Sequence, residues 1–282
     1  MTGALRPRHG GGIALVSTAL LSGLHLLAPF AAGVSAPPSI DGMPPHLLPA
    51  DTPQVDTLPD PVHGNTDRVP GPEAGELPPG LPGAWTEENG LWINREARAI
   101  SLTASVQADA FMASLPPDHQ YHGLVNVDGG AASKALFVTE VDDLEIARVL
   151  RELGAQDGGG VPMSAWNLRW VPLVPQPGSR VQGSPIEVTI HWQGAERHFS
   201  LEELVEDSGG EGVEIRFGGN EEHSHHWESG CILCFFSCPG GVVSNAAYTI
   251  RDHQRGATTF DAGTRLPPDG TRIQITFVVG PG

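Results

Sequence analysis

Apolar residues recur at helical spacing in one clear segment of the chain, residues 142–154. They occupy positions i, i+3, i+4 and i+7 and would share one helix face: Ile146, Val149, Leu150 and Leu153. Asp142 or Asp143 can cap the start of such a helix, and Gly154 can end it. We therefore predict one amphipathic helix here, with its apolar face in the core.

Alternation of apolar and polar positions predicts strands along most of the remaining chain. In PIEVTIHW, residues 185–192, every second residue is apolar, as in a strand with one buried face. Further strands are expected within residues 91–106 (around a turn at 94–98), 121–127, 134–140, 213–217, 231–237, 246–252 and 272–279. SLEELVED, residues 200–207, predicts a short capped helix, and LPPDGT, residues 266–271, predicts a turn. The pattern indicates a strand-rich α+β fold with a mainly antiparallel sheet and one clear helix.

The first 83 residues have the composition of targeting and linker segments. Arg6 and Arg8 precede an apolar stretch at residues 13–32 and a run of small residues, so residues 1–36 are predicted to be a signal peptide. Residues 37–83 contain thirteen of the 26 prolines and few apolar residues, which predicts a disordered tether. Residues 84–282 then form the globular domain. We expect export to the periplasm or the extracellular space, with no stable membrane span once the signal is removed.

Composition and absent motifs narrow the classes of function. The formal net charge of −17 argues against nucleic acid as a partner, because a basic surface is needed to bind phosphates. The sequence has no phosphate-binding G-x-x-x-x-G-K-[ST], no G-x-S-x-G nucleophile motif and no H-E-x-x-H zinc motif. An enzyme is therefore a weaker expectation than a non-hydrolytic module.

The three cysteines of the chain lie in one short stretch, RFGGNEEHSHHWESGCILCFFSCPGG. Cys231, Cys234 and Cys238, followed by Pro239, spell C-x2-C-x3-C-P, which matches the last three ligands of a bacterial ferredoxin run. The first ligand of such a run would fall on Glu228. Nearby histidines could supply another ligand to an iron–sulfur cluster or to a zinc or copper ion: His223, His225 and His226.

Two other interpretations of the cysteines stay open. If residues 231–238 were one extended strand, Cys231 and Cys234 would face opposite sides about 10 Å apart and would only pack in the core. A Cys231–Cys234 pair could instead be a thiol redox site, since an odd number of cysteines in an exported chain leaves at least one thiol free. Arg6 and Arg8 are not a twin-arginine pair, which disfavours export of a preloaded iron–sulfur protein.

The residues around the cysteines resemble the YdjY-like domain of bacterial proteins. The resemblance covers roughly residues 121–279 and is most specific at F-G-G-N followed by G-C-x-x-C-x-x-S-C-P-x-G-x-x-S-N. The matching positions are Gly218, Gly219, Asn220, Gly230, Cys231, Cys234, Ser237, Cys238, Pro239, Ser244 and Asn245. His122 falls where the family also places a histidine, which makes it a further candidate ligand beside the simpler role of a core residue. The family is described as ferredoxin-like or as linked to oxidoreductase systems, so the resemblance implies a site more than a reaction.

These observations favour an exported accessory module whose cysteines hold a metal ion, an iron–sulfur cluster or a redox thiol. Its partner would be an envelope redox protein. One alternative is an interaction domain with the cysteines in its core and no cofactor. Another is a thiol-dependent enzyme in which a histidine activates the Cys231 or Cys234 thiolate.

Overall fold

The predicted strands assemble into one large mixed sheet. The computed structural model describes residues 81–115 and 119–281. The predicted signal peptide and all but the last three residues of the predicted tether lie outside the described residues, so both stay predictions, as do the boundaries at 36 and 83. Every described residue belongs to one compact unit of the chain.

The first half of the domain contains, in order, β1 (Thr86–Glu88), β2 (Leu91–Asn94), β3 (Ala99–Val106), α1 (Ala108–Ala113), β4 (His122–Asn126), η2 (Ala132–Lys134), β5 (Ala135–Thr139), α2 (Asp143–Glu152), α3 (Met163–Asn167) and η3 (Gln176–Gly178). The second half contains β6 (Ile186–Trp192), β7 (Phe199–Ser200), α4 (Leu201–Leu204), β8 (Val205–Asp207), β9 (Ile215–Phe217), α5 (Glu221–Trp227), β10 (Cys231–Cys234), β11 (Val243–Asn245), α6 (Ile250–Gln254), β12 (Phe260–Ala262) and β13 (Arg272–Val279).

The large sheet has eleven strands, nine of which follow the order β7-β6-β13-β3-β5-β4-β10-β11-β9. Strand β2 pairs with β3 and with β1, and β8 and β12 form a separate two-stranded sheet. All pairs are antiparallel except β4–β5 and β10–β11. The predicted α+β class with a mainly antiparallel sheet is therefore confirmed.

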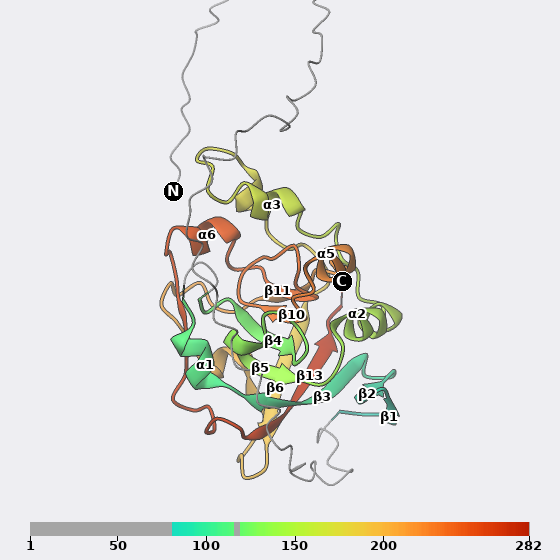
Figure 1. Ribbon diagram of the computed structural model, residues 1–282. Coiled ribbons are helices and arrows are strands. Elements are labelled where there is room, and N and C mark those ends of the chain that lie inside the picture. The colour runs from blue at the N-terminus through green and yellow to red at the C-terminus, as the bar shows by residue number, and fades with distance from the viewer. Residues whose placement is uncertain (1–80, 116–118, 282) are drawn as a thin grey trace, which may run out of the picture. The chain divides into compact units, whose positions relative to one another are not determined.

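Helix α2 is the predicted amphipathic helix. The Asp142 carboxylate caps it by accepting hydrogen bonds from the Leu144 and Glu145 amides, and Gly154 follows its end with a φ of 89°. Its apolar face is buried: Ile146, Ala147, Val149 and Leu150. In Figure 1 α2 lies beside α5, while α3 and α6 lie together at the other end of the β4 strand. Helix α2 thus covers part of the sheet that contains β10 and β3.

Local signals correctly predict several short elements and fail at two places. The predicted helix at residues 200–207 is helical only over α4, because residues 205–207 form the strand β8. The capping box of Ser200 and Glu203 starts α4, and turns occupy residues 95–98 and 269–270. Residues 246–252 are not the predicted strand. Pairing ends at Asn245, and Thr249 with Asp252 forms a capping box that starts α6. The hydrogen bonds of that cap outweigh the β-propensity of the local apolar residues.

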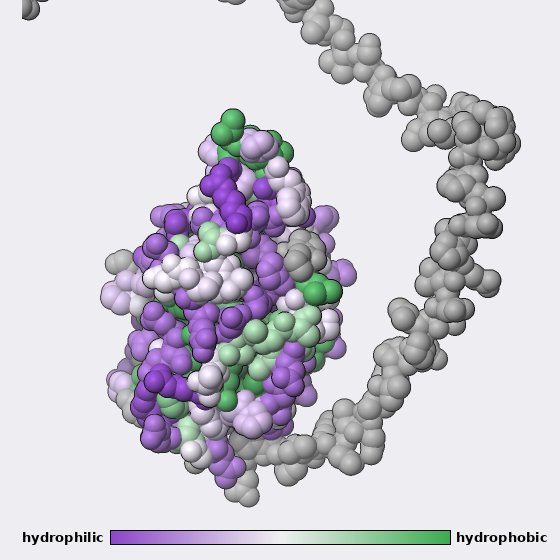
Figure 2. All heavy atoms as spheres, turned by 90° about the vertical axis from the view of Figure 1, so that its left-hand side faces the viewer, coloured by the Kyte–Doolittle hydropathy of each residue, from purple (hydrophilic) through white to green (hydrophobic). Residues whose placement is uncertain are grey.

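Within the described residues no helix has the length and apolarity needed to cross a bilayer. Figure 2 shows hydrophilic side chains over most of the face in view, as expected for a chain with 33 acidic and 16 basic residues.

A candidate cysteine and histidine metal centre

Three neighbouring strands, β4, β10 and β11, place the candidate centre toward the β9 edge of the large sheet. Cys234 on β10 lies opposite His122 on β4 and opposite Ser244 on β11. The three residues therefore form one row across the sheet. Gly123 follows His122 and permits this pairing, since an added Cβ there would lie 2.2 Å from the Leu233 side chain. The YHGLV segment thus brings a histidine to the cysteines from more than a hundred residues away.

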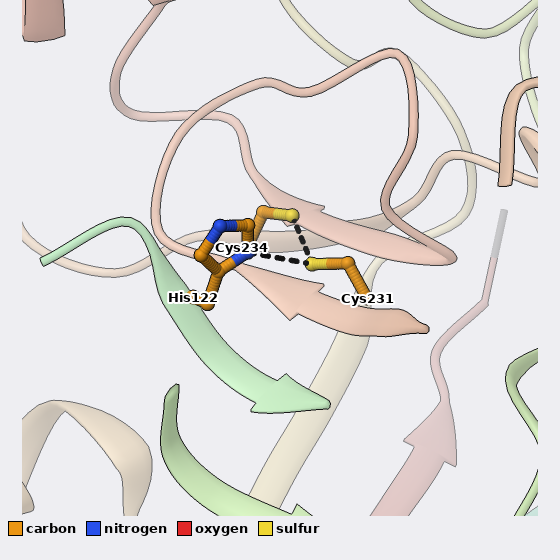
Figure 3. Close-up of side chains that lie close together, drawn as sticks. All are labelled: His122, Cys231 and Cys234. Atoms are coloured by element: carbon orange, nitrogen blue, oxygen red, sulfur yellow. Dashed lines mark hydrogen bonds between the residues drawn. The ribbon is translucent and has the colours of Figure 1, made fainter. Parts of the chain in front are cut away.

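An irregularity in β10 turns both of its cysteines toward the same place. The register between β10 and β4 shifts on each side of Leu233. In a regular strand residues three apart face opposite sides, but a bulge adds one residue and restores a common side. As Figure 3 shows, the Cys231 and Cys234 sulfurs point toward one another, 2.6 Å apart, and His122 Nδ1 lies 3.4 Å from the Cys231 sulfur. The extended-strand interpretation of this segment is therefore wrong.

A tight reversal after β10 returns the third cysteine to the first two. Residues 235–242 connect β10 to the parallel strand β11, and the Cys238 sulfur interacts with the Cys234 thiol. The Gly240 amide donates to the Cys238 sulfur at 3.3 Å. From outside the turn, Asn220 Nδ2 donates to the carbonyls of Cys238 (2.9 Å) and Gly241 (3.2 Å). Asn220 thus holds both ends of the Cys-Pro-Gly-Gly turn, including Pro239.

The other residues of the family pattern brace the same turn. The Gly218 and Gly219 amides both donate to the Val242 carbonyl, at 2.8 and 3.1 Å. The Ser237 hydroxyl donates to the Asn245 carbonyl at 3.1 Å, and the Asn245 side chain accepts from the Glu214 and Ala247 amides. These hydrogen bonds fix the turn without touching the sulfurs. The pattern residues are thus mostly a scaffold for the cysteines.

Gly230, immediately before Cys231, allows a close approach of two chain segments. Its φ is 66°, and an added Cβ would lie 2.8 Å from the Gly129 Cα. A side chain at this position would be strained and would push β10 away from the loop after β4. The glycine therefore sets the start of the cysteine strand.

The three thiols differ in their acidity although all are buried. Burial raises the pKa of Cys231, and burial with the thiol neighbours Cys231 and Cys238 raises the pKa of Cys234 well above its usual value. Burial would also raise the pKa of Cys238. There, however, interactions with the Cys234 thiol, the Gly240 amide, the nearby Tyr121 hydroxyl and the Gly241 amide lower it. Cys238 is the thiol most easily ionised, and Cys234 is the one that stays protonated beside it.

Two buried hydroxyl groups border the sulfurs, and within the described residues neither has a nitrogen or oxygen atom as hydrogen-bond partner. They belong to Tyr121 and Ser244, and both oxygens are buried. A buried hydroxyl without a partner costs about 1–3 kcal/mol. The site is also tight, because a Cβ added to Gly241 would lie 2.8 Å from both the Cys234 sulfur and the Ser244 oxygen. Buried donors beside sulfur suit a charged thiolate, free or bound to a metal, better than they suit an apolar core.

A cavity of about 340 Å³ opens beside the centre. Cys231 and Cys238 line it together with His122, while Trp166 of α3 and Trp227 of α5 form an aromatic wall with ring centroids 5.5 Å apart. Lys134, the one lysine of the chain, also lines the cavity, and its charge favours ionisation of Cys231. A ligand or another protein could therefore reach two of the sulfurs.

The structure does not bring the three clustered histidines into this centre. His223, His225 and His226 lie on α5, where His225 and His226 are exposed, and Glu228 ends that helix with a φ of 48°. Within the described residues, the group whose ligand atoms all lie within 4.8 Å of one another is His122, Cys231 and Cys234. Nearness in sequence put the α5 histidines forward, but a helix of seven residues carries them away from β10.

Several residues of the site carried no sequence signal strong enough to nominate them. Tyr121, Lys134, Trp166 and Trp227 contact the cavity from four separate segments. The sequence offered two hints: Tyr121 directly precedes His122, and Lys134 is the one lysine of the chain. Their convergence depends on the strand order of the sheet, which alternation alone does not give.

Comparison with known proteins identifies the family to which the chain belongs. The model of a family described as the YdjY domain matches residues 91–278. A protein of Escherichia coli (strain K12) with the name "Uncharacterized protein YdjY" is 32% identical over 164 residues, which cover 57% of this chain and 68% of that protein. No solved structure gives a significant match. The family match includes β2 to β13 and every residue of the candidate centre, and the chain therefore belongs to the YdjY domain family.

Proposed function

We propose that this protein is a metal-binding module whose cysteine and histidine centre holds a thiophilic ion, zinc or copper(I). The observation that carries the proposal is the meeting of His122, Cys231 and Cys234 within 4.8 Å at a buried site. Residues drawn from two strands converge there because of the bulge in β10. Hydrophobic packing alone would not require the ligand atoms of these three residues to lie so close together.

The donor set supports this class of ion. Cys238 lies beside the Cys234 thiol but outside the group whose ligand atoms are all within 4.8 Å of one another. When Cys238 is included, three thiols and an imidazole form a Cys3His set, which is one of the usual sets for zinc. Thiolates also select copper(I) and iron–sulfur clusters over hard cations such as magnesium. A pKa of Cys238 below its ordinary value supplies one ionised ligand at little cost. The unpartnered hydroxyls of Tyr121 and Ser244 could donate to metal-bound sulfur.

The cavity suggests how such an ion would be used. Cys231 and Cys238 face the cavity, so an ion bound between the sulfurs would be accessible from that side. An accessible ion can accept a further ligand, whereas a purely structural zinc is closed. We propose that the module presents its ion to a redox protein of the cell envelope.

Export is part of this proposal and has its own support in the sequence. The arginines at 6 and 8, the apolar residues 13–32 and the proline-rich residues 37–83 fit a signal peptide followed by a tether. N-terminal sequencing of the protein recovered from its producing cell tests it. A mature chain that begins near residue 37 supports export, and an intact Met1 in the cytoplasm contradicts it.

Metal titration of matched histidine variants tests the centre. The full chain is prepared without metal under anaerobic conditions, and zinc and copper(I) affinities are measured by competition with a chromophoric chelator. We expect one tightly bound ion per chain, and His122→Gln should weaken binding by more than about tenfold. His225→Gln, on exposed α5, should leave the affinity unchanged.

Equal effects of the two histidine variants would contradict the assignment of His122. Because His122 is buried, thermal unfolding of the metal-free variants is measured in parallel. A His122→Gln chain that unfolds at the parental temperature and binds metal at the parental affinity would remove His122 from the site. An absorption band typical of iron–sulfur clusters in the native protein would show that the centre holds a cluster and not a single ion.

Thiol–disulfide exchange is a second candidate, favoured by the 2.6 Å approach of the Cys231 and Cys234 sulfurs. The two thiols would lose two electrons and two protons and form one S–S bond. A disulfide of another molecule would accept the electrons and protons and become two thiols. Mass spectrometry of the alkylated protein after exposure to oxidised glutathione distinguishes the candidates. A stable, redox-active Cys231–Cys234 bond in protein that binds no metal would favour the second.

A further inference from the structure

The loop between α3 and η3, residues 168–175, combines exposed apolar side chains with a positive charge. Trp170, Val171 and Leu173 are 64%, 42% and 96% exposed. These three account for half of the large hydrophobic residues found exposed in the described part of the chain. Figure 2 shows hydrophobic side chains gathered at the tip of the domain, beside strongly hydrophilic ones. Exposed apolar clusters of this kind mark contact sites.

The charge around this loop is opposite to that of the whole molecule. Residues 158–186 contain no aspartate or glutamate, and their charged residues are Arg169 and Arg180. Arg251 of α6 adds a third cation, since its guanidinium donates to the Val174 carbonyl. Within the described residues these arginines bond to backbone carbonyls and none forms an ion pair. A chain with a net charge of −17 thus has one locally cationic and apolar tip.

The loop is held in shape before it meets any partner. The Arg169 guanidinium lies 4.0 Å from the Trp166 ring centroid and 5.4 Å from that of Trp170, and it donates to the Trp166 carbonyl. Leu173 adopts a φ of 67°, a left-handed conformation that is rare for a branched apolar residue, at the most exposed point. Strained conformations persist where the surrounding structure enforces them, often at contact sites. The loop would therefore lose little conformational entropy on binding.

We propose that the 168–175 loop is a membrane-contact element that inserts into the headgroup region of an anionic bilayer. The Trp170 indole suits the interface between water and lipid, and Val171 and Leu173 would enter the edge of the acyl region. Arg169, Arg180 and Arg251 would face lipid phosphates. A projecting tip of three side chains suits a deformable bilayer better than a protein partner, because specific protein interfaces need about 800 Å² from each side.

Vesicle binding by the full chain tests the proposal. Vesicles of phosphatidylglycerol with phosphatidylethanolamine are compared with vesicles of phosphatidylcholine alone. We expect preference for the anionic vesicles, and a combined Trp170→Ser and Leu173→Ser variant should bind about tenfold more weakly, given the transfer free energy of those side chains. Leu115→Ser, which removes a side chain 78% exposed outside the loop, is the matched control and should bind as the parent does.

Charge is tested in the same assay with a second pair of variants. Arg180→Gln should weaken binding to anionic vesicles about fivefold and leave binding to phosphatidylcholine unchanged. Arg95→Gln, at an exposed arginine paired with Glu88, should change neither. Circular dichroism of each variant verifies that the fold is retained.

Residues 13–32 are apolar and could bind vesicles themselves. A measurement of how deeply tryptophan enters the bilayer distinguishes binding by the loop from binding by those residues. Bromine-labelled acyl chains should quench tryptophan fluorescence in the parent, and Trp170→Phe should remove that quenching while vesicle binding persists. Quenching that survives Trp170→Phe would overturn the proposal, as would equal binding to both vesicle types. Self-association of the chain that depends on Trp170 and Leu173, with no vesicle binding, would overturn it too and assign the loop to a second copy.

Discussion

At the scale of single residues, the three thiols of the centre differ because their hydrogen-bond donors differ. The Cys238 sulfur interacts first with the Cys234 thiol and then with the amides of its own turn, whereas Cys231 and Cys234 lie in a strand whose amides are used in pairing. A thiolate accepts hydrogen bonds, so donors lower the pKa and burial without donors raises it. Pro239 directly follows the three cysteines and begins the turn that creates this difference in thiol pKa.

Alkylation of the metal-free protein as a function of pH tests this difference. A thiolate forms as pH rises through the pKa, so the lowered pKa of Cys238 moves the onset of its reaction below the ordinary value of 9.0. Cys231 and Cys234 have raised pKa values and should react only at higher pH. Peptide mapping after brief treatment with iodoacetamide should therefore find the label on Cys238 first. Equal labelling of all three, or labelling of Cys234 first, would contradict this order.

The sequence pointed to the cysteine segment, but the histidine that lies near Cys231 and Cys234 is not one of the three closest along the chain. The C-x2-C-x3-C-P spacing and the family pattern are local signals, and the structure brings Cys231 and Cys234 together with Cys238 beside Cys234. The histidine in contact with them is His122, which lies on a neighbouring strand, and not the three on α5. Strand pairing is a long-range property, so closeness along the chain was a poor guide to which histidine meets the cysteines.

At the scale of elements, the bulge in β10 and the reversal after it create the centre. Without the register shifts at Leu233, the two cysteines of β10 would face opposite sides of the sheet. The sequence predicted the strand but not the bulge, because a bulge depends on how the partner strand β4 pairs. The wrong strand at residues 246–252 has a different cause, because there a local capping box of Thr249 and Asp252 starts a helix.

Paired glycine variants test the tight reversal. A Cβ at Gly241 would lie 2.8 Å from the Cys234 sulfur, whereas a Cβ at exposed Gly178 has no atom within 4 Å. Gly241→Ala should lower the free energy of unfolding by about 1–3 kcal/mol and weaken metal binding, because the sulfur must shift. Gly178→Ala should change stability by less than about 0.5 kcal/mol and leave binding unchanged. Parental metal affinity in Gly241→Ala would show that the Cys234 sulfur is not held as described.

At the scale of the whole molecule, a strand-rich domain brings together chemistry from separate parts of the chain. Alternation predicted the fold class and most strands, and the main helix with its cap was predicted to within a residue. Strand order, which places β4 between β5 and β10, could not be read from alternation. The cavity wall shows the same limit, since Trp166 and Trp227 meet only in the folded domain.

The central claim is that the sulfurs of this centre and His122 bind one metal ion. X-ray absorption at the zinc edge, recorded on the full chain loaded with zinc, tests it most directly. The account predicts a shell of sulfur ligands at about 2.3 Å with one nitrogen at about 2.0–2.1 Å. A first shell of nitrogen and oxygen alone, or zinc that is lost on gel filtration, would contradict it.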